Sequence, residues 1–404
     1  MMAAADIARI GEQLAGLDKP GGPAIWDTRI DACPARAADP AMVEHIRHQA
    51  LLRAYQSRYV LLPSEGPGDT VERLRRRYDP KALVQVEAAR GQLEDELITP
   101  SIEAARAAAQ GRDWATYSEA LVGAVRQAPE SAFTAFLRTS ALAADHYRNF
   151  LLQSSADLLA EASASALGVV GEFGPAQSAL FRILIDEFGY GAHDRKHAVL
   201  YRPLMTAFGL PDEYNACWSL FDTPALRLHN TIHCLFQNPR HLFLQVGFLL
   251  HAETSYQRST RDHFRYLSEA FPAVDARYFG EHAHIDLHHT RMVIEEVAAP
   301  LVAAHGPEVG FEIVAGAELT RQAFAETGAQ MLALSRAFEA AVGDGRAAGR
   351  APSFERLDAA VTPAGAAGLP NHARVQVGGL GVVEAAVFAG FPSGAFGRVL
   401  EGAA

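Results

Sequence analysis

The sequence predicts an all-α protein built as a helical bundle. Apolar residues recur three and four positions apart in long stretches, strand-like alternation is nearly absent, and helix-start and helix-break signals separate the stretches. With 404 residues, of which 49% are hydrophobic, the chain has enough material for one large core with appended segments. We therefore expect one main helical domain.

The helical stretches follow one another along the chain. Asp39 and Pro40 begin the first, as a capping residue followed by proline at the first helical position. The glycine-rich sequence GVVGEFGPAQ is a break between two helices. The periodic stretches are PAMVEHIRHQALLRAYQSRYVLL, FTAFLRTSALAADHYRNFLLQSSADLLAEA, SALFRILIDEF, RHLFLQVGFLLHAETSYQRS and GAQMLALSRAFEAAV.

Composition divides the chain into three regions. Residues 1–125 form a leading helical segment, for which packing on the main domain and homodimer formation are both open interpretations. Residues 126–345 form the main domain. Residues 346–404 are rich in alanine, glycine and proline, and this tail is interpreted either as a cap on the bundle or as partly disordered.

Charge and cysteine content exclude several partners and compartments. A net charge of −11 argues against a nucleic-acid groove or binding to an anionic membrane, because both need clustered basic residues. We see no secretory signal and no apolar stretch long enough to span a membrane. The three cysteines are scattered and lack a CxxC pattern, so the expected location is a reducing cytoplasm.

The stretch EHAHIDLHHT, residues 281–290, carries four histidines. On a helix that advances about 100° per residue, His282, Asp286 and His289 lie within about 60° of one another. His284 and His288 point elsewhere. A buried face with this composition is costly when empty and favourable around a cation, whereas the alternative interpretation is a wet helix surface.

Other segments supply possible partners for this face. Glu253 lies in the middle of an otherwise apolar helix, where an unpaired carboxylate is expensive. Glu161 lies within an apolar series, Glu187 follows in ILIDEFGYG, and His197 comes ten residues later. Carboxylates and imidazoles therefore come from four separate helical segments.

Charge counting favours a dinuclear iron site. Glu161, Glu187, Glu253 and Asp286 carry four negative charges, which two ferrous ions would balance, with three imidazoles completing the ligand set. Mixed carboxylate and imidazole ligands suit non-haem iron, and helical bundles commonly hold dimetal carboxylate sites in their cores.

The ordered ligand set resembles the haem-oxygenase-like diiron oxidases and oxygenases, also described as iron-containing redox enzymes. The resemblance covers roughly residues 125–345 and implies a bundle of about seven core helices with inward-facing iron ligands. The residues that carry it are Glu161, Glu187, His197, Glu253, His282, Asp286 and His289.

The resemblance also implies individual roles. Glu161 and Glu253 are similar to bridging or terminal carboxylates, and His197 is similar to the imidazole ligand of one iron. On a straight helix Glu187 would lie about 15 Å along the axis from His197, unless the glycines between them bend the chain. Asp194, three residues before His197, is the competing ligand. Glu187 is preferred because it resembles the extra glutamate of the N-oxygenating branch.

The function implied by the resemblance is N-oxygenation of a small amine or amino-acid-like substrate. Two ferrous ions would reduce dioxygen, the co-substrate, to a peroxo-diferric species that the substrate nitrogen attacks. Nothing in the chain resembles a flavin or nicotinamide site, so an external electron donor is expected. The alternatives are a diiron desaturase or oxidative carbon–carbon lyase acting on an aliphatic acid or amino acid, and a noncatalytic iron-binding protein.

Few residues point to the substrate itself. Tyr190, Tyr256 and Trp218 are candidates for a pocket wall, although plain core packing is the commoner role for such aromatic residues. Arg202 and Arg261 are candidates for holding a substrate carboxylate, with exposed salt bridges as the alternative.

Overall fold

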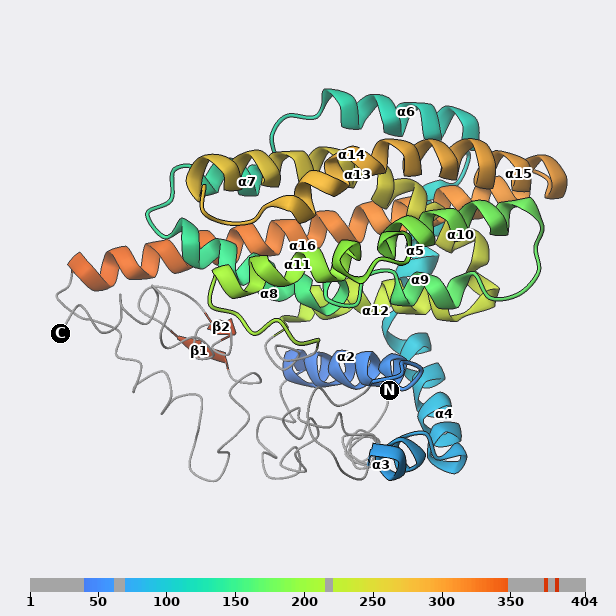
Figure 1. Ribbon diagram of the computed structural model, residues 1–404, viewed down its shortest axis with the longest axis horizontal. Helices are drawn as coiled ribbons and strands as arrows, with labels where there is room; N and C mark the ends of the chain where they lie inside the picture. The colour runs from blue at the N-terminus through green and yellow to red at the C-terminus, as the bar shows by residue number, and fades with distance from the viewer. Residues whose placement is uncertain (1–39, 62–69, 215–220, 348–373, 377–381, 385–404) are drawn as a thin grey trace.

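The computed structural model describes residues 40–61, 70–214, 221–347, 374–376 and 382–384, and Figure 1 shows their arrangement. The described residues form a helical bundle, which confirms the all-α prediction. Two short strands that pair in antiparallel fashion, β1(Arg374–Gln376) and β2(Val382–Glu384), are the exception. The predicted cap Asp39, Trp218 and most of the tail lie outside the described residues.

The leading helices pack on the main bundle. Leu51, Leu93 and Ile102 belong to the same buried cluster as Leu235 and Ile313 from later helices. One helix, α2, packs against α12, and α5 packs against α16 (Figure 1). The domain boundary at residue 125 and a homodimer stay predictions. The helices of this region are α2(Pro40–Gln56), α3(Thr70–Arg77), α4(Pro80–Leu97), α5(Thr99–Ala109) and α6(Trp114–Gln127).

The long stretch predicted as one helix from residue 133 is interrupted. A short helix begins after Ser131, whose side chain accepts a hydrogen bond from the backbone N–H of Thr134, and a break precedes α8. Helix α8 ends at Leu158, so Glu161 lies in the turn that follows it. The predicted glycine-rich break separates α10 from a helix of only six residues, α9. The helices here are α7(Ala132–Leu137), α8(Ala143–Leu158), α9(Ser163–Gly168) and α10(Pro175–Glu187).

The longest helices form the centre of the bundle. Helix α13 packs along α14 and α16, and α12 contacts both α13 and α16 (Figure 1). None of the described helices carries an apolar stretch suited to crossing a bilayer. The α-helices are α11(His197–Ala207), α12(Thr223–Gln237), α13(Leu242–Ala270), α14(Arg277–Met292), α15(Ala299–His305) and α16(Pro307–Ala347), and the π-helix η6(Val293–Ala298) joins α14 to α15.

Two glycines let α13 and α16 approach closely. A Cβ atom added to Gly247 would lie 2.0 Å from the backbone oxygen of Ile313, and one added to Gly316 would lie 2.1 Å from that of Leu244. Both contacts are with backbone atoms, which a rotamer change cannot relieve. This contact fixes the position of α13, which also carries Glu253.

We expect Gly247→Ala to lower the free energy of unfolding by about 1–3 kcal/mol, because the added methyl group forces the two helices apart. The matched control is Gly123→Ala in α6, where an added Cβ meets nothing within 4 Å. The control should gain up to about 1 kcal/mol from helix propensity. Denaturant unfolding of both variants measures the difference, and equal stabilities would contradict the close-contact argument.

Candidate metal centre

The histidines of α14 lie on two different sides of the helix. His282, Asp286 and His289 are buried, and Asp286 and His289 have no exposed surface at all. His284 and His288 are exposed. The burial follows the predicted division of the helix, and Glu253 of α13 lies against the buried side, 3.2 Å from His289.

A tight loop brings Glu187 to His197. Helix α10 ends at Glu187, and two 3-10 turns, η2(Gly189–Gly191) and η3(His193–Arg195), lead to α11, which begins at His197. Gly189 has a φ of 64°, and a Cβ atom there would lie 2.4 Å from the backbone carbon of Arg195. The folded-back chain places Glu187 Oε2 2.6 Å from His197 Nδ1. Asp194, the competing candidate, is exposed within η3.

Four of the predicted residues form one group. Glu161, Glu187, His197 and His282 each offer a ligand atom, and these atoms lie within 4.8 Å of one another. The Nε2 atom of His282 lies 3.2 Å from Glu161 Oε1 and 3.9 Å from Glu187 Oε2. This spacing is suitable for one cation.

The other three predicted residues form a second group beside the first. Glu253, Asp286 and His289 also place ligand atoms within 4.8 Å of one another. His289 Nδ1 lies 3.2 Å from Glu253 Oε2 and 3.6 Å from Glu187 Oε1. Glu187 therefore faces the first group with one oxygen and the second with the other. This position makes Glu187, rather than Glu161 or Glu253, the carboxylate best placed to join two metal ions.

Several side chains of these groups are oriented by hydrogen bonds with residues that the sequence analysis did not predict. The Nδ1–H of His282 donates to the backbone oxygen of Tyr278, which leaves Nε2 for the first group. The Nε2–H of His289 donates to Asp186, which leaves Nδ1 for the second. The Tyr278 hydroxyl donates to Glu161 at 2.9 Å. Such contacts commonly fix the ring orientation and basicity of metal-binding side chains.

The side chains of the two groups strongly shift one another's pKa values. Burial opposes charge on His289, but the carboxylate of Glu253 and contacts with Asp186 and Glu187 raise the pKa of its imidazole to about 11. Despite burial, the facing histidines, His197 first, lower the pKa of Glu187 to about 2. Burial is the largest cause that raises the pKa of Asp286 well above its usual value. Protons thus balance part of the negative charge.

The buried oxygens of the site fit metal ions. Among the described residues, neither carboxylate oxygen of Asp286 has a hydrogen-bond partner, and Glu161 Oε2 also lacks one. Leaving such groups buried and unsatisfied costs about 1–3 kcal/mol each, and more when they are charged. Cations would satisfy them, and the mixed carboxylate and imidazole set suits iron. The seven residues could hold two ions, one at each group.

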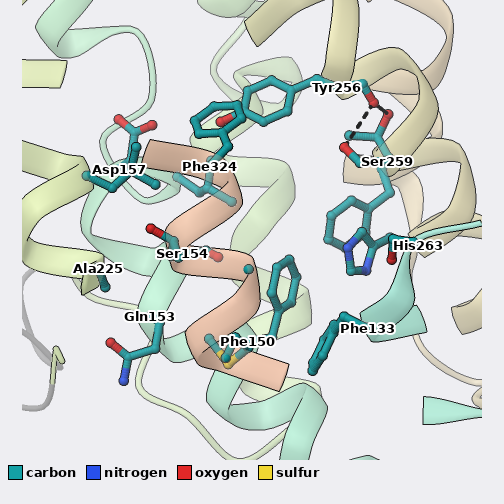
Figure 2. Close-up of a pocket in the computed structure, with 18 of the residues that line it drawn as sticks. Phe133, Phe150, Gln153, Ser154, Asp157, Ala225, Tyr256, Ser259, His263 and Phe324 are labelled. Atoms are coloured by element: carbon teal, nitrogen blue, oxygen red, sulfur yellow. Dashed lines mark hydrogen bonds between the residues drawn. The ribbon is translucent and has the colours of Figure 1, made fainter. Parts of the chain in front are cut away.

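Two adjoining cavities open beside these groups. The smaller, of about 70 Å³, is lined by Glu161, Glu187, Glu253 and His282 among others. The larger, of about 340 Å³, shares Asp157, Ile232, Tyr256 and His282 with the smaller. Figure 2 shows the aromatic side chains around the larger cavity.

Two residues of the cavity walls, Tyr256 and Asp157, can be compared with the sequence analysis. Tyr256, one of the candidates for a pocket wall, lines both cavities, whereas the candidate Tyr190 is 61% exposed. Burial, followed by the charges of Glu161 and Glu187, raises the pKa of Asp157 to about 7. Sequence reasoning missed Asp157, although it precedes Glu161 by four residues in the same apolar series.

Comparison with known proteins finds, for the region that contains the ligand groups, the same family that the ordered ligand set resembles. Residues 148–325 match the family described as iron-containing redox enzyme, inside the predicted main domain. The nitrosourea synthase of Streptomyces achromogenes subsp. streptozoticus is 41% identical over 172 residues. The match covers 42% of this chain, and the chain spans only 36% of the relative's length. Residues 148–325 therefore match the iron-containing redox enzyme family, and the described residues of this region have the all-α, haem-oxygenase-like fold that the sequence predicts.

Proposed function

We propose that this protein is a non-haem diiron oxygenase that uses dioxygen to N-oxygenate a small amine or amino-acid-like substrate. The observation that carries the proposal is the placement of Glu187, whose two oxygens face the two ligand groups. A carboxylate between two groups, each with further carboxylates and histidine, is an arrangement suited to a pair of iron ions.

The named relative supports nitrogen as the atom that is oxidised. A nitrosourea carries a nitroso group, in which nitrogen is bonded to oxygen, and the relative is named as the synthase of such a compound. Glu187 also resembles the extra glutamate of the N-oxygenating branch of the family. These two observations favour N-oxygenation over desaturation or carbon–carbon cleavage.

Each part of the site has a role in this proposal. Glu161, Glu187, His197 and His282 would hold one ion, and Glu253, Asp286 and His289 the other, with Glu187 shared. Bound iron would supply the binding and reduction of dioxygen. Asp186 and Tyr278 hold the ligand side chains in place, and the burial of these side chains in the bundle would limit the access of water. The further partners would be the amine substrate and an external electron donor in a reducing cytoplasm.

Anaerobic loading with ferrous iron followed by rapid mixing with oxygen tests the proposal. We expect about two iron ions per chain, a transient absorption in the visible range, and oxygen-dependent gain of one oxygen atom by an amine. Mass spectrometry of a panel of amines and amino acids identifies the product. Loss of two hydrogens or of a carbon fragment would instead establish the desaturase or lyase reaction, and failure to bind two irons would refute the diiron centre.

A further inference from the structure

The larger cavity has an unusual charge balance for a site that would take an amino acid. Among its described wall residues there is no lysine or arginine, and Asp157 is the only carboxylate. His229 and His263 add no positive charge near neutral pH, because burial lowers the pKa of each imidazole to about 4. Asp157 is therefore the only described wall residue that can carry a negative charge. His282, whose pKa the carboxylates of the ligand groups, Glu161 first, raise despite burial, is the remaining basic group, and it faces the first ligand group.

Aromatic rings cover much of the remaining wall. Phe150 stacks on His263 with ring centroids 4.5 Å apart, and His263 stacks on Phe279 at 5.1 Å. Tyr256 and Phe324 form a second stack at 5.4 Å. Figure 2 shows Tyr256 and Phe324 on the same side of the cavity as Asp157. The faces of such rings attract cations and also accommodate an apolar body.

Asp157 stands where the cavity meets the metal centre. It lies in the last turn of α8, four residues before Glu161, and lines both cavities together with Tyr256. No described group donates a hydrogen bond to its carboxylate. A cationic nitrogen held there would face the ligand side chains, and the rest of the molecule would extend away from them.

We propose that the larger cavity binds a primary amine that has an apolar, aromatic-sized body and no carboxylate, with Asp157 holding the ammonium nitrogen beside the metal centre. This inference rests on the proposed function and narrows its substrate class to amines other than amino acids. The carboxylate of an amino acid would lie near Asp157, and no lysine or arginine among the described residues lines the cavity to pair with it. Arg202 and Arg261 are both exposed and neither lines the cavity.

Three matched compounds test the inference by calorimetry. Phenethylamine carries the expected ammonium group, 2-phenylethanol replaces it with a neutral hydroxyl, and L-phenylalanine adds a carboxylate. Titrations use the full-length protein loaded with ferrous iron in the absence of oxygen, so that no turnover occurs. We expect phenethylamine to bind at least about tenfold more tightly than either of the other two.

Two variants test whether Asp157 causes the preference for phenethylamine. Asp157→Asn keeps the side-chain shape and should reduce the preference for phenethylamine over 2-phenylethanol to less than about threefold. Asp194→Asn, the same change on the exposed loop, should keep the wild-type preference. Equal binding of the three compounds by the wild type, tighter binding of L-phenylalanine, or an unchanged preference in Asp157→Asn would each overturn the inference. Because binding is scored without oxygen, these outcomes are separate from a failure of the oxygenase reaction.

Discussion

Replacing Glu187 with alanine is expected to reduce bound iron from about two ions per chain to about one and to slow the oxygen reaction at least about 100-fold. The variant loses an oxygen 2.6 Å from His197 and another 3.6 Å from His289, so each ligand group loses an oxygen ligand and the site as a whole loses one negative charge. Removal of residues that only orient metal ligands already costs 10–100-fold, so a shared ligand should cost more. Iron analysis and rapid-mixing absorption measure the two effects.

Asp194→Ala is the matched control for this experiment. Asp194 lies on the same loop and was the competing candidate from the sequence, but it is exposed. The control should bind iron and react with oxygen as the wild type does. The assignment of Glu187 fails if the control loses iron while Glu187→Ala keeps two ions.

Helical periodicity predicted the bundle but not its interruptions. The stretch from residue 133 to 162 is periodic throughout, yet α7 ends at Leu137 and α8 begins at Ala143. The same pattern gave no indication that α8 would end before Glu161 or that a π-helix would follow α14. Periodicity reports which residues face a core, whereas helix ends depend on the segments that pack around them.

The sequence predicted those parts of the candidate site in which the residue types themselves indicate metal binding. Spacing alone placed His282, Asp286 and His289 on one face of a helix. Their sequence context suggested the remaining ligands as partners, and the resemblance then ordered them as one set. Glycine at position 189 indicated a bend but not its direction, and only the folded loop shows that Glu187 meets His197.

The residues that orient the ligands were missed for a physical reason. Asp186 bonds to His289 across 103 positions, and Tyr278 bonds to Glu161 across 117, so neither contact has a local signal. Tyr278 was partly recoverable, because it lies four residues before His282 on the same helix face. Asp157 had no signal that separated a cavity wall from an ordinary helix end.

Asp286→Asn is expected to change the stability of the metal-free protein little and to remove most of the stability gained from iron. Burial, the largest cause, raises the pKa of Asp286 well above its usual value, which favours the neutral side chain in the metal-free protein, and the amide has nearly the same shape. Metal-free stability should therefore stay within about 1 kcal/mol of the wild type. Iron at about 100 times its Kd would stabilise the wild type by roughly 2.7 kcal/mol, and the variant by less than half of that. Thermal unfolding under argon, with and without ferrous iron, compares them.

The pH dependence of the same measurement separates metal binding from general stabilisation. The pKa of His289 is raised to about 11 in the metal-free fold, so its contribution to stability is complete below its unfolded pKa of about 6.5 and disappears as the pH rises toward 11. Iron takes the place of the proton, and its affinity rises with pH as protons leave the ligands. The difference in Tm between iron-loaded and metal-free wild type should therefore widen from pH 6.5 to 9, and more than in Asp286→Asn. A difference that narrows with pH, or that is equal in the two proteins, would show that iron does not bind at these groups.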